Sequence, residues 1–195
     1  MLYSELQCSE AIHKAVERMG FAEMTEIQEK TIPVMLAGHD VIAKAPTGTG
    51  KTCAFGIPVA EHIQPENKYP QAVIMAPTRE LAQQIAEELS NLTYFMPEVQ
   101  VACVYGGANM EKQAKRLAEG CQIVVATPGR LMDHYKHHSI DISHVTQIVL
   151  DEADEMLNMG FYKDVRHIIE MMKARKALSM FSATISREVM DIGWL

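Results

Sequence analysis

Short apolar runs alternate with longer amphipathic stretches through most of this 195-residue chain. Residues 72–76 (AVIMA) and 123–126 (IVVA) are continuously apolar, as strands are when both faces of a parallel sheet are covered. Runs of this kind lie at residues 40–45, 72–77, 99–106, 122–127, 147–151 and 177–182. Helical patterns separate them, for example residues 78–94. The alternation predicts an α/β protein, a three-layer α/β/α sandwich with a mostly parallel sheet.

Residues 1–38 differ from the rest because they contain two helical patterns and no strand pattern. Ser9 and Thr25 are expected to cap these helices, and Gln28 completes a capping box with Thr25. Pro33 lies inside the second pattern and should bend or divide that helix. We expect residues 1–38 to lie over one edge or face of the sheet, and residues 39–195 to form the main domain.

A glycine-rich turn follows the first predicted strand. Residues 45–52 (APTGTGKT) join that strand to a helical pattern, which is the context that a phosphate-binding P-loop requires. The glycines allow backbone N–H groups to point at phosphate oxygens, and the helix dipole adds positive potential. An ordinary glycine-rich turn is the alternative. The predicted nucleotide-binding residues here are Thr47, Gly48, Thr49, Gly50, Lys51 and Thr52, with Lys51 on the β- and γ-phosphates and Thr52 on Mg²⁺.

Two acids, Asp151 and Glu152, end the fifth predicted strand. A buried acidic pair is costly unless it meets a cation, and Mg²⁺ beside Asp151 would satisfy that need. Glu152 is then placed to orient or deprotonate the attacking water. A solvated strand end is the alternative. We interpret Lys51, Asp151 and Glu152 as catalytic residues of nucleotide hydrolysis, with Thr52 and Asp151 as metal ligands.

Composition limits the remaining possibilities. The formal charge of −7 argues against a protein that coats nucleic acid through bulk positive charge. The four cysteines form no CxxC pair, which disfavours zinc, and free thiols fit a cytoplasmic protein. The start of the chain lacks a signal-peptide pattern, and its apolar runs are too short to span a membrane. The histidine-rich residues 134–138 are expected to end a helix and face water.

The motifs occur in an order that resembles the DEAD-box ATP-dependent RNA helicases, and residues 151–154 spell DEAD. The other resembling segments are residues 20–28 (Q motif), 45–52 (motif I), 77–81 (motif Ia), 106–107 (GG motif), 127–130 (motif Ib) and 182–184 (motif III). Two residues depart from the family pattern: Met24 stands where Pro is usual, and Tyr3 where Phe is usual. The resemblance implies a RecA-like P-loop domain.

The resemblance also implies roles in the nucleotide site. Gln28 should read the adenine of ATP through N6 and N7, and its capping of its own helix is compatible with that role. Tyr3 and Phe21 should belong to the same adenine site, with the Tyr3 ring available for stacking. Ser182 and Thr184 should bond to Asp154 or its neighbours and link the nucleotide state to RNA binding.

The RNA contacts implied by the resemblance lie just beyond the C-terminal ends of predicted strands, where open α/β sheets place their ligands. They are Pro77, Thr78, Arg79, Gly106, Gly107, Thr127, Pro128, Gly129 and Arg130. Their glycines, hydroxyls and guanidinium groups suit the RNA backbone without sequence preference. No aromatic residue accompanies them, so base stacking is not expected. The alternative is that Arg79 and Arg130 only bond to nearby acids.

Family members have a second RecA-like domain, whose arginines reach the γ-phosphate. The chain ends about ten residues after the last of these motifs, so we expect a monomeric first domain that binds ATP and Mg²⁺ but hydrolyses ATP very slowly. Two alternatives remain open at this stage. One is a helicase or translocase acting on DNA, and the other is a non-enzymatic RNA-binding module.

Overall fold

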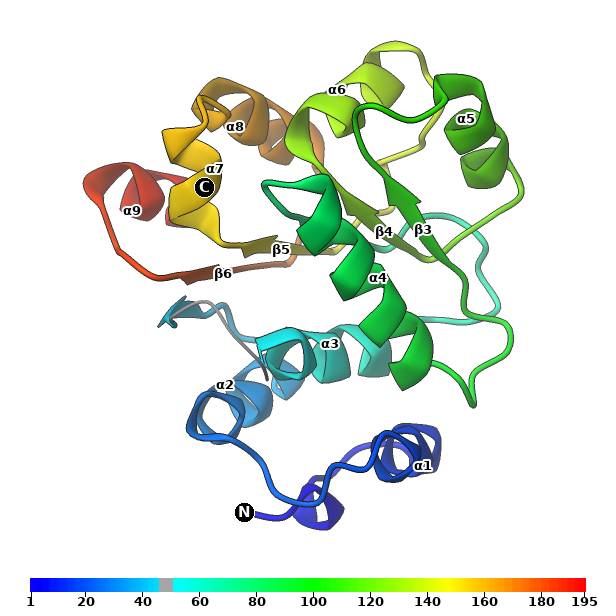
Figure 1. The fold of residues 1–195 in the computed structure, drawn as a ribbon, viewed down its shortest axis with the longest axis vertical. Helices are drawn as coiled ribbons and strands as arrows, with labels where there is room; N and C mark the ends of the chain where they lie inside the picture. The colour runs from blue at the N-terminus through cyan, green and yellow to red at the C-terminus, as the bar shows by residue number, and fades with distance from the viewer. Residues whose placement is uncertain (46–50) are drawn as a thin grey trace.

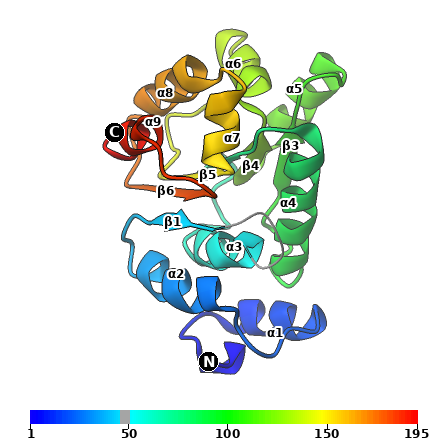
Figure 2. The same cartoon turned by 60° about the vertical axis from the view of Figure 1, so that its left-hand side comes forward.

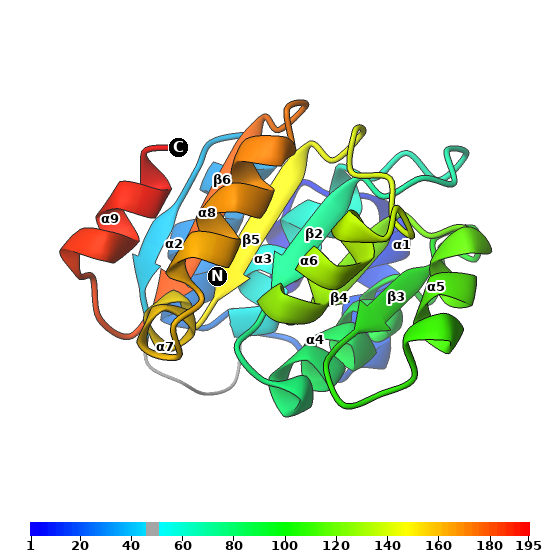
Figure 3. The ribbon, with the colours of Figure 1, turned by 90° about the horizontal axis from the view of Figure 1, so that it is seen from above.

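A parallel sheet forms the centre of the computed structural model, which describes residues 1–45 and 51–195. In these residues the strands are β1 (Ile42–Lys44), β2 (Ala72–Met75), β3 (Val101–Val104), β4 (Ile123–Ala126), β5 (Gln147–Asp151) and β6 (Ala177–Ser182). Their order is β1-β6-β5-β2-β4-β3, and each described pairing is parallel (Figure 3). Every predicted apolar run thus contains one strand, and the predicted sheet is confirmed.

Helices cover both faces of this sheet, which gives the expected three layers (Figure 1). The faces are covered by α3 (Lys51–Glu61) and α4 (Arg79–Leu92) on one side, and on the other by α5 (Met110–Ala118), α6 (Pro128–Lys136), α7 (Ala153–Asn158), α8 (Tyr162–Met171) and α9 (Arg187–Gly193). The remaining elements are α1 (Glu10–Arg18), α2 (Glu26–Leu36) and a 3-10 turn at Tyr3–Glu5.

Each face of the sheet has its own apolar cluster. Along β2, Ala72 and Ile74 face α3 and α4, whereas Val73 and Met75 face the helices of the opposite layer. All four side chains are buried. The period-two alternation of a strand therefore sends apolar side chains to both sides, which explains why β2 has no polar position.

The N-terminal helices form a further layer outside α3 and α4 (Figure 2). Ile12 of α1 and Ile32 of α2 are fully buried in the same apolar cluster as Phe55 of α3. The expectation that this region lies directly over an edge or face of the sheet is therefore corrected, because α3 and α4 already cover that face. Pro33 does not divide α2, which is one helix across it.

Parallel strands bring their C-terminal ends to one edge of the sheet. Asp151 ends β5 and Ser182 ends β6, and Ser182 lies beside Lys44, the last residue of β1. The chain segments after β2, β4 and β3 leave the same edge farther along. A cavity of about 640 Å³ lies at the opposite edge, where Gln71 and Gln147 form part of its lining. Among the described residues, none of the helices has the length and apolarity to cross a membrane.

Candidate functional site

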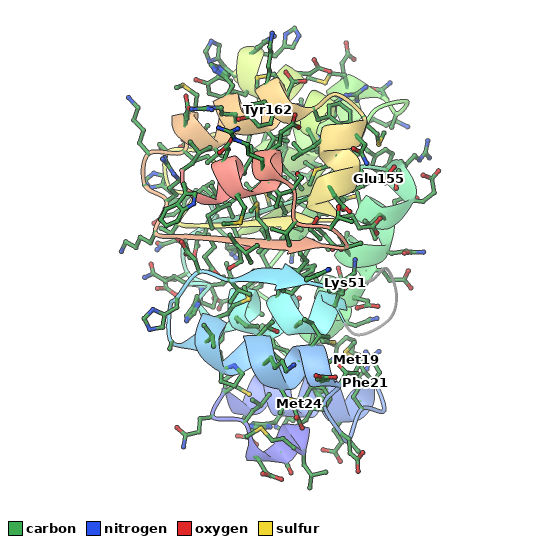
Figure 4. All side chains as sticks on the ribbon, turned by 90° about the vertical axis from the view of Figure 1, so that its left-hand side faces the viewer. Met19, Phe21, Met24, Lys51, Glu155 and Tyr162 are labelled. Carbon is green, nitrogen blue, oxygen red and sulfur yellow. The ribbon has the colours of Figure 1, made fainter. Side chains whose placement is uncertain are left out.

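Lys51 and the two acids predicted to act with it meet at this edge. The Lys51 Nζ lies 3.0 Å from Asp151 Oδ1 and 3.8 Å from Glu152 Oε2. Lys51 and Asp151 are both buried, so the ammonium supplies the cation that a buried carboxylate needs. Figure 4 places Lys51 on the same side of the molecule as Glu155 of α7 above it and Phe21 below it.

Burial disfavours the charged forms of both acids. It raises the pKa of Asp151, although the neighbouring Lys51 opposes the shift. Burial is also the main reason that the pKa of Glu152 is raised, and the charges of Asp151, Asp154 and Glu155 add to it. A carboxyl group whose pKa is moved toward neutrality is better matched to accepting a proton near neutral pH than an ordinary glutamate.

The backbone at Glu152 has the left-handed conformation, with φ 51° and ψ 52°. This conformation is uncommon for residues other than glycine and costs energy, and it frequently marks functional sites. It occurs at the junction where β5 ends and α7 begins, and the Glu152 N–H donates to Asp151 Oδ1 at 3.0 Å. The sharp turn leaves Asp151 buried while Glu152 is partly exposed.

The predicted contact between residues 182–184 and Asp154 is present. The Asp154 N–H donates to Ser182 Oγ at 3.1 Å, and the Thr184 hydroxyl donates to Asp154 Oδ2 at 2.9 Å. The Ser182 hydroxyl in turn donates to the Thr184 carbonyl. Burial raises the pKa of Asp154, but the hydrogen bonds that the Thr184 hydroxyl and N–H donate to its carboxylate outweigh burial and hold that pKa below its ordinary value. These bonds join the start of α7 to the segment after β6.

A third carboxylate, Glu88 of α4, lies beside the site and was missed in the sequence. Burial raises the pKa of Glu88, a hydrogen bond from Thr52 lowers it, and the charge of Asp151 raises it further. Glu88 lies next to the predicted metal ligand Thr52. It belongs to none of the sequence motifs and lies inside a helix, so the sequence did not indicate that it is near the site. The other predicted phosphate-binding residues, Thr47, Gly48, Thr49 and Gly50, lie outside the described residues.

The three residues of the predicted adenine site come together around Gln28. Tyr3 and Gln28 are 4% and 3% exposed, and the Tyr3 hydroxyl donates to Gln28 Oε1. Gln28 also forms the predicted capping box with Thr25. The Tyr3 and Phe21 rings are stacked with centroids 6.2 Å apart, and Phe21 is 43% exposed. Phe21 thus offers an accessible ring, whereas Tyr3 has little accessible ring surface.

The segments predicted to contact RNA follow neighbouring strands, β2, β4 and β3. Thr78 caps α4, because its hydroxyl oxygen accepts a hydrogen bond from the Leu81 N–H. Arg79 is exposed, and its guanidinium lies 4.7 Å from the centroid of the Tyr105 ring. An aromatic residue therefore does accompany the predicted RNA contacts, which corrects the sequence-based expectation. Tyr105 directly precedes Gly106, so the sequence itself could have indicated an aromatic residue next to the GG motif.

Gly106 and Gly107 are exposed on this edge. Gly107 has φ +84°, a conformation that side chains other than glycine rarely adopt, and an added Cβ would lie 3.9 Å from the Arg79 guanidinium. Of the predicted contacts, Pro77 and Pro128 are buried, and Thr127 is 9% exposed.

Arg130 is bound by other groups of the protein. The alternative interpretation, that Arg130 only bonds to nearby acids, is therefore correct in part. The Arg130 NH1 donates to the Ala108 carbonyl and to Gln113 Oε1, both at 3.0 Å, and its Nε lies 3.6 Å from Asp133. Two of these partners are carbonyl oxygens rather than acids. His134 is fully buried with its Nε2 3.0 Å from Gln113 Oε1, so the expectation that His134 faces water is wrong.

Comparison with known proteins gives the chain a family. It is 49% identical over 99% of its length to "ATP-dependent RNA helicase CshA" of Limosilactobacillus reuteri, and 42% identical over 97% to "ATP-dependent RNA helicase DeaD" of Escherichia coli. It spans 39% and 30% of those two proteins. The crystal structure of a DEAD box protein from Methanococcus jannaschii covers 100% of the chain with a TM-score of 0.91 at 40% identity, and the chain covers 53% of it.

Both relatives are named as ATP-dependent RNA helicases, and the matched structure is that of a DEAD box protein. The structural match covers the whole chain, including the parallel sheet and the helices on both sides of it. The family model described as "DEAD/DEAH box helicase" matches residues 25–192, which include Gln28, Lys51, the acids after β5 and Ser182. The chain belongs to the DEAD/DEAH box helicase family.

Proposed function

We propose that this chain is the ATP-binding RecA-like domain of an ATP-dependent RNA helicase that separates RNA strands locally. The observation that carries the proposal is the convergence of Lys51, Asp151 and Glu152 within salt-bridge distance at the C-terminal edge of a parallel sheet. Nucleotide sites of open α/β proteins lie at this edge. The names of the relatives, both ATP-dependent RNA helicases, support ATP and RNA as the substrate classes.

In the proposed site, Lys51 binds the phosphates of ATP, and Glu152 orients or deprotonates the attacking water. Asp151 and Thr52 supply a carboxylate and a hydroxyl, which are the hard oxygen ligands that Mg²⁺ prefers. The raised pKa of Asp151 fits this role, because a buried carboxylate gains most from a nearby cation. When bound, Mg²⁺ would neutralise charge on the phosphate oxygens.

The proposed RNA contacts lie along the same edge, at the segments after β2, β3 and β4. Arg79 and the exposed backbone of Gly106 and Gly107 support binding to RNA phosphates. Asp154, Ser182 and Thr184 would couple the nucleotide site to this surface through their hydrogen bonds. We place the domain in the cytoplasm and expect the isolated chain to be a monomer.

A second RecA-like domain would complete the enzyme. The chain spans less than half the length of the two named helicases, which supports this part of the proposal. An arginine from the second domain that reaches the γ-phosphate would account for about 10³–10⁵ of the hydrolysis rate. The isolated chain should therefore bind ATP and ADP but turn ATP over very slowly.

Calorimetric titration of Lys51→Ala with ADP tests the nucleotide site. The affinity for ADP should fall at least about tenfold, because a charge-assisted hydrogen bond to phosphate is lost. Lys163→Ala is the matched control, since Lys163 is exposed on α8. Thermal unfolding must first show that Lys51→Ala is folded, because Asp151 loses its cation. If folding fails, Thr52→Val replaces it and should weaken ADP binding only when Mg²⁺ is present. Unchanged ADP affinity would overturn the proposal.

A further inference from the structure

The side-chain oxygen of Gln28 already accepts two hydrogen bonds inside the protein. The Thr25 N–H donates to Gln28 Oε1 at 3.0 Å, and the Tyr3 hydroxyl donates to the same oxygen. An amide oxygen has two lone pairs, so these two donors match its full capacity. Burial raises the pKa of Tyr3, so the phenol stays protonated and can donate at neutral pH.

The orientation of this amide is fixed by chemistry. A backbone N–H can only donate, so the Gln28 atom facing Thr25 has to be the oxygen. The Nε2 group must then point away from Thr25. Gln28 is 3% exposed and Tyr3 4% exposed, so water has little access to replace either partner. The pair is held further by the stacking of the Tyr3 ring on Phe21.

This arrangement bears on how the site reads a purine. Adenine presents an N6 amino donor and an N7 acceptor on one edge, and a glutamine can pair with both through its oxygen and its nitrogen. Here the oxygen that would accept from N6 is the atom that Tyr3 and Thr25 already use. Binding adenine through N6 therefore means displacing one of these donors, and a displaced buried hydroxyl would lose its hydrogen bond.

We propose that the Tyr3 hydroxyl is a specificity-determining group that competes with the adenine N6 amino group for Gln28 Oε1, so that this site discriminates only weakly at the purine 6-position. The inference rests on the proposed ATP site. Adenine and hypoxanthine share N7, so a contact to N7 does not separate the two bases. A phenylalanine at position 3, the residue usual in the family pattern, would leave the oxygen one lone pair for N6.

Calorimetry of the chain and its Tyr3→Phe variant with ADP and IDP tests the inference. IDP differs from ADP at the purine 6-position, where an oxygen replaces the amino group. Tyr3→Phe should raise the preference for ADP over IDP by roughly three- to tenfold, the effect of one neutral hydrogen bond. Tyr94→Phe is the matched control, because Tyr94 is 56% exposed and outside the site. It should leave the preference unchanged.

A third ligand, 7-deaza-ADP, separates N7 recognition from N6 recognition. It should bind more weakly than ADP to both proteins, and the relative loss should be larger in the unsubstituted chain. A preference for ADP over IDP that is unchanged or reduced in folded Tyr3→Phe would overturn the inference alone. If the folded, unsubstituted chain binds neither ADP nor IDP, the proposed nucleotide site fails, and the inference fails with it.

Discussion

The Lys51–Asp151 pair accounts for how an acid can be held 1% exposed at the end of a central strand. Removing one partner of a buried ion pair typically costs about 3–5 kcal/mol, since the other charge is left without compensation. A bound nucleotide and its metal would change this balance: the phosphates attract the ammonium, and the metal attracts the carboxylate. The pair therefore keeps both charged groups in place until their proposed ligands arrive.

Glu152→Gln tests the proposed base in a protein that carries both RecA-like domains. Glutamine keeps the size and shape of the side chain, but an NH₂ donor replaces one acceptor oxygen, and the amide cannot accept the proton from water. RNA-stimulated ATP turnover should fall about 10²–10⁴-fold, the usual contribution of general base catalysis. The affinity for ADP should remain close to that of the unsubstituted protein. Turnover as fast as that of the parent would show that Glu152 is not the base.

Asp154→Asn tests the link between α7 and the segment after β6. The hydrogen bonds from Thr184 hold the folded-state pKa of Asp154 below its ordinary value of 3.8. A depressed pKa means that the carboxylate stabilises the fold above about pH 3.8, and that this contribution is lost as the pH falls through the folded-state pKa. Partial exposure limits the effect, so the substitution should lower the free energy of unfolding by roughly 1 kcal/mol at neutral pH.

The free energy of unfolding in urea should be measured for the unsubstituted chain and for Asp154→Asn, from neutral pH to below pH 3.8. The difference between them should shrink as the solution is acidified below pH 3.8. Asp191→Asn is the control, because Asp191 is exposed on α9, away from this link. A difference that stays constant with pH would mean that the charge of Asp154 contributes nothing to the fold.

At the scale of elements, the strands were predictable because their signal is local. In a parallel sheet covered on both faces, the central strands β2, β4 and β5 are buried at each residue. β2 and β4 are apolar throughout, and β5 is apolar except for Gln147 and Asp151 at its two ends. The capping box of α2 is local in the same sense, since Thr25 and Gln28 are three residues apart. Neither feature depends on distant parts of the chain.

Features that depend on distant segments could not be predicted from the sequence. The place of α1 and α2 outside α3 and α4 depends on which apolar faces are already covered. Arg130 reads as an exposed RNA contact until the fold brings the Ala108 carbonyl and Gln113 to it. The stacking of Arg79 over Tyr105 likewise joins the start of α4 to the residue that follows β3.

Gly56→Ala tests how tightly α3 packs on α4. A Cβ at Gly56 would lie 2.8 Å from Leu92 Cδ1 and 3.2 Å from Leu89 Cδ2, and both leucines are fully buried. Alanine is about 1 kcal/mol better than glycine inside a helix, but overpacking typically costs about 1–3 kcal/mol. The substitution should therefore lower the free energy of urea unfolding. In a Leu92→Ala background the cost should shrink, because the closer of the two contacts is removed, and an equal cost in both backgrounds would contradict this packing.

At the scale of the whole molecule, a formal charge of −7 has to be reconciled with the proposed RNA binding. Bulk attraction to a polyanion is excluded by this charge, so affinity must come from a few donors aimed at phosphates. The edge after β2, β3 and β4 offers such donors: Arg79 is exposed there, and Gly106 and Gly107 present accessible backbone. Arg130 contributes less to this surface, because the protein itself already binds its guanidinium.

We therefore predict that RNA affinity depends only shallowly on salt concentration and that Arg79 makes a measurable contribution to this dependence. Each phosphate contact to single-stranded nucleic acid contributes about 0.7 to the slope of log affinity against log salt concentration. In the two-domain protein, Arg79→Ala should reduce that slope by about 0.7 and weaken binding equally for oligouridine and mixed-sequence RNA. Arg166→Ala is the matched control, since Arg166 is exposed on α8 and paired with Glu170. A loss confined to one RNA sequence would show that Arg79 reads bases instead of the backbone.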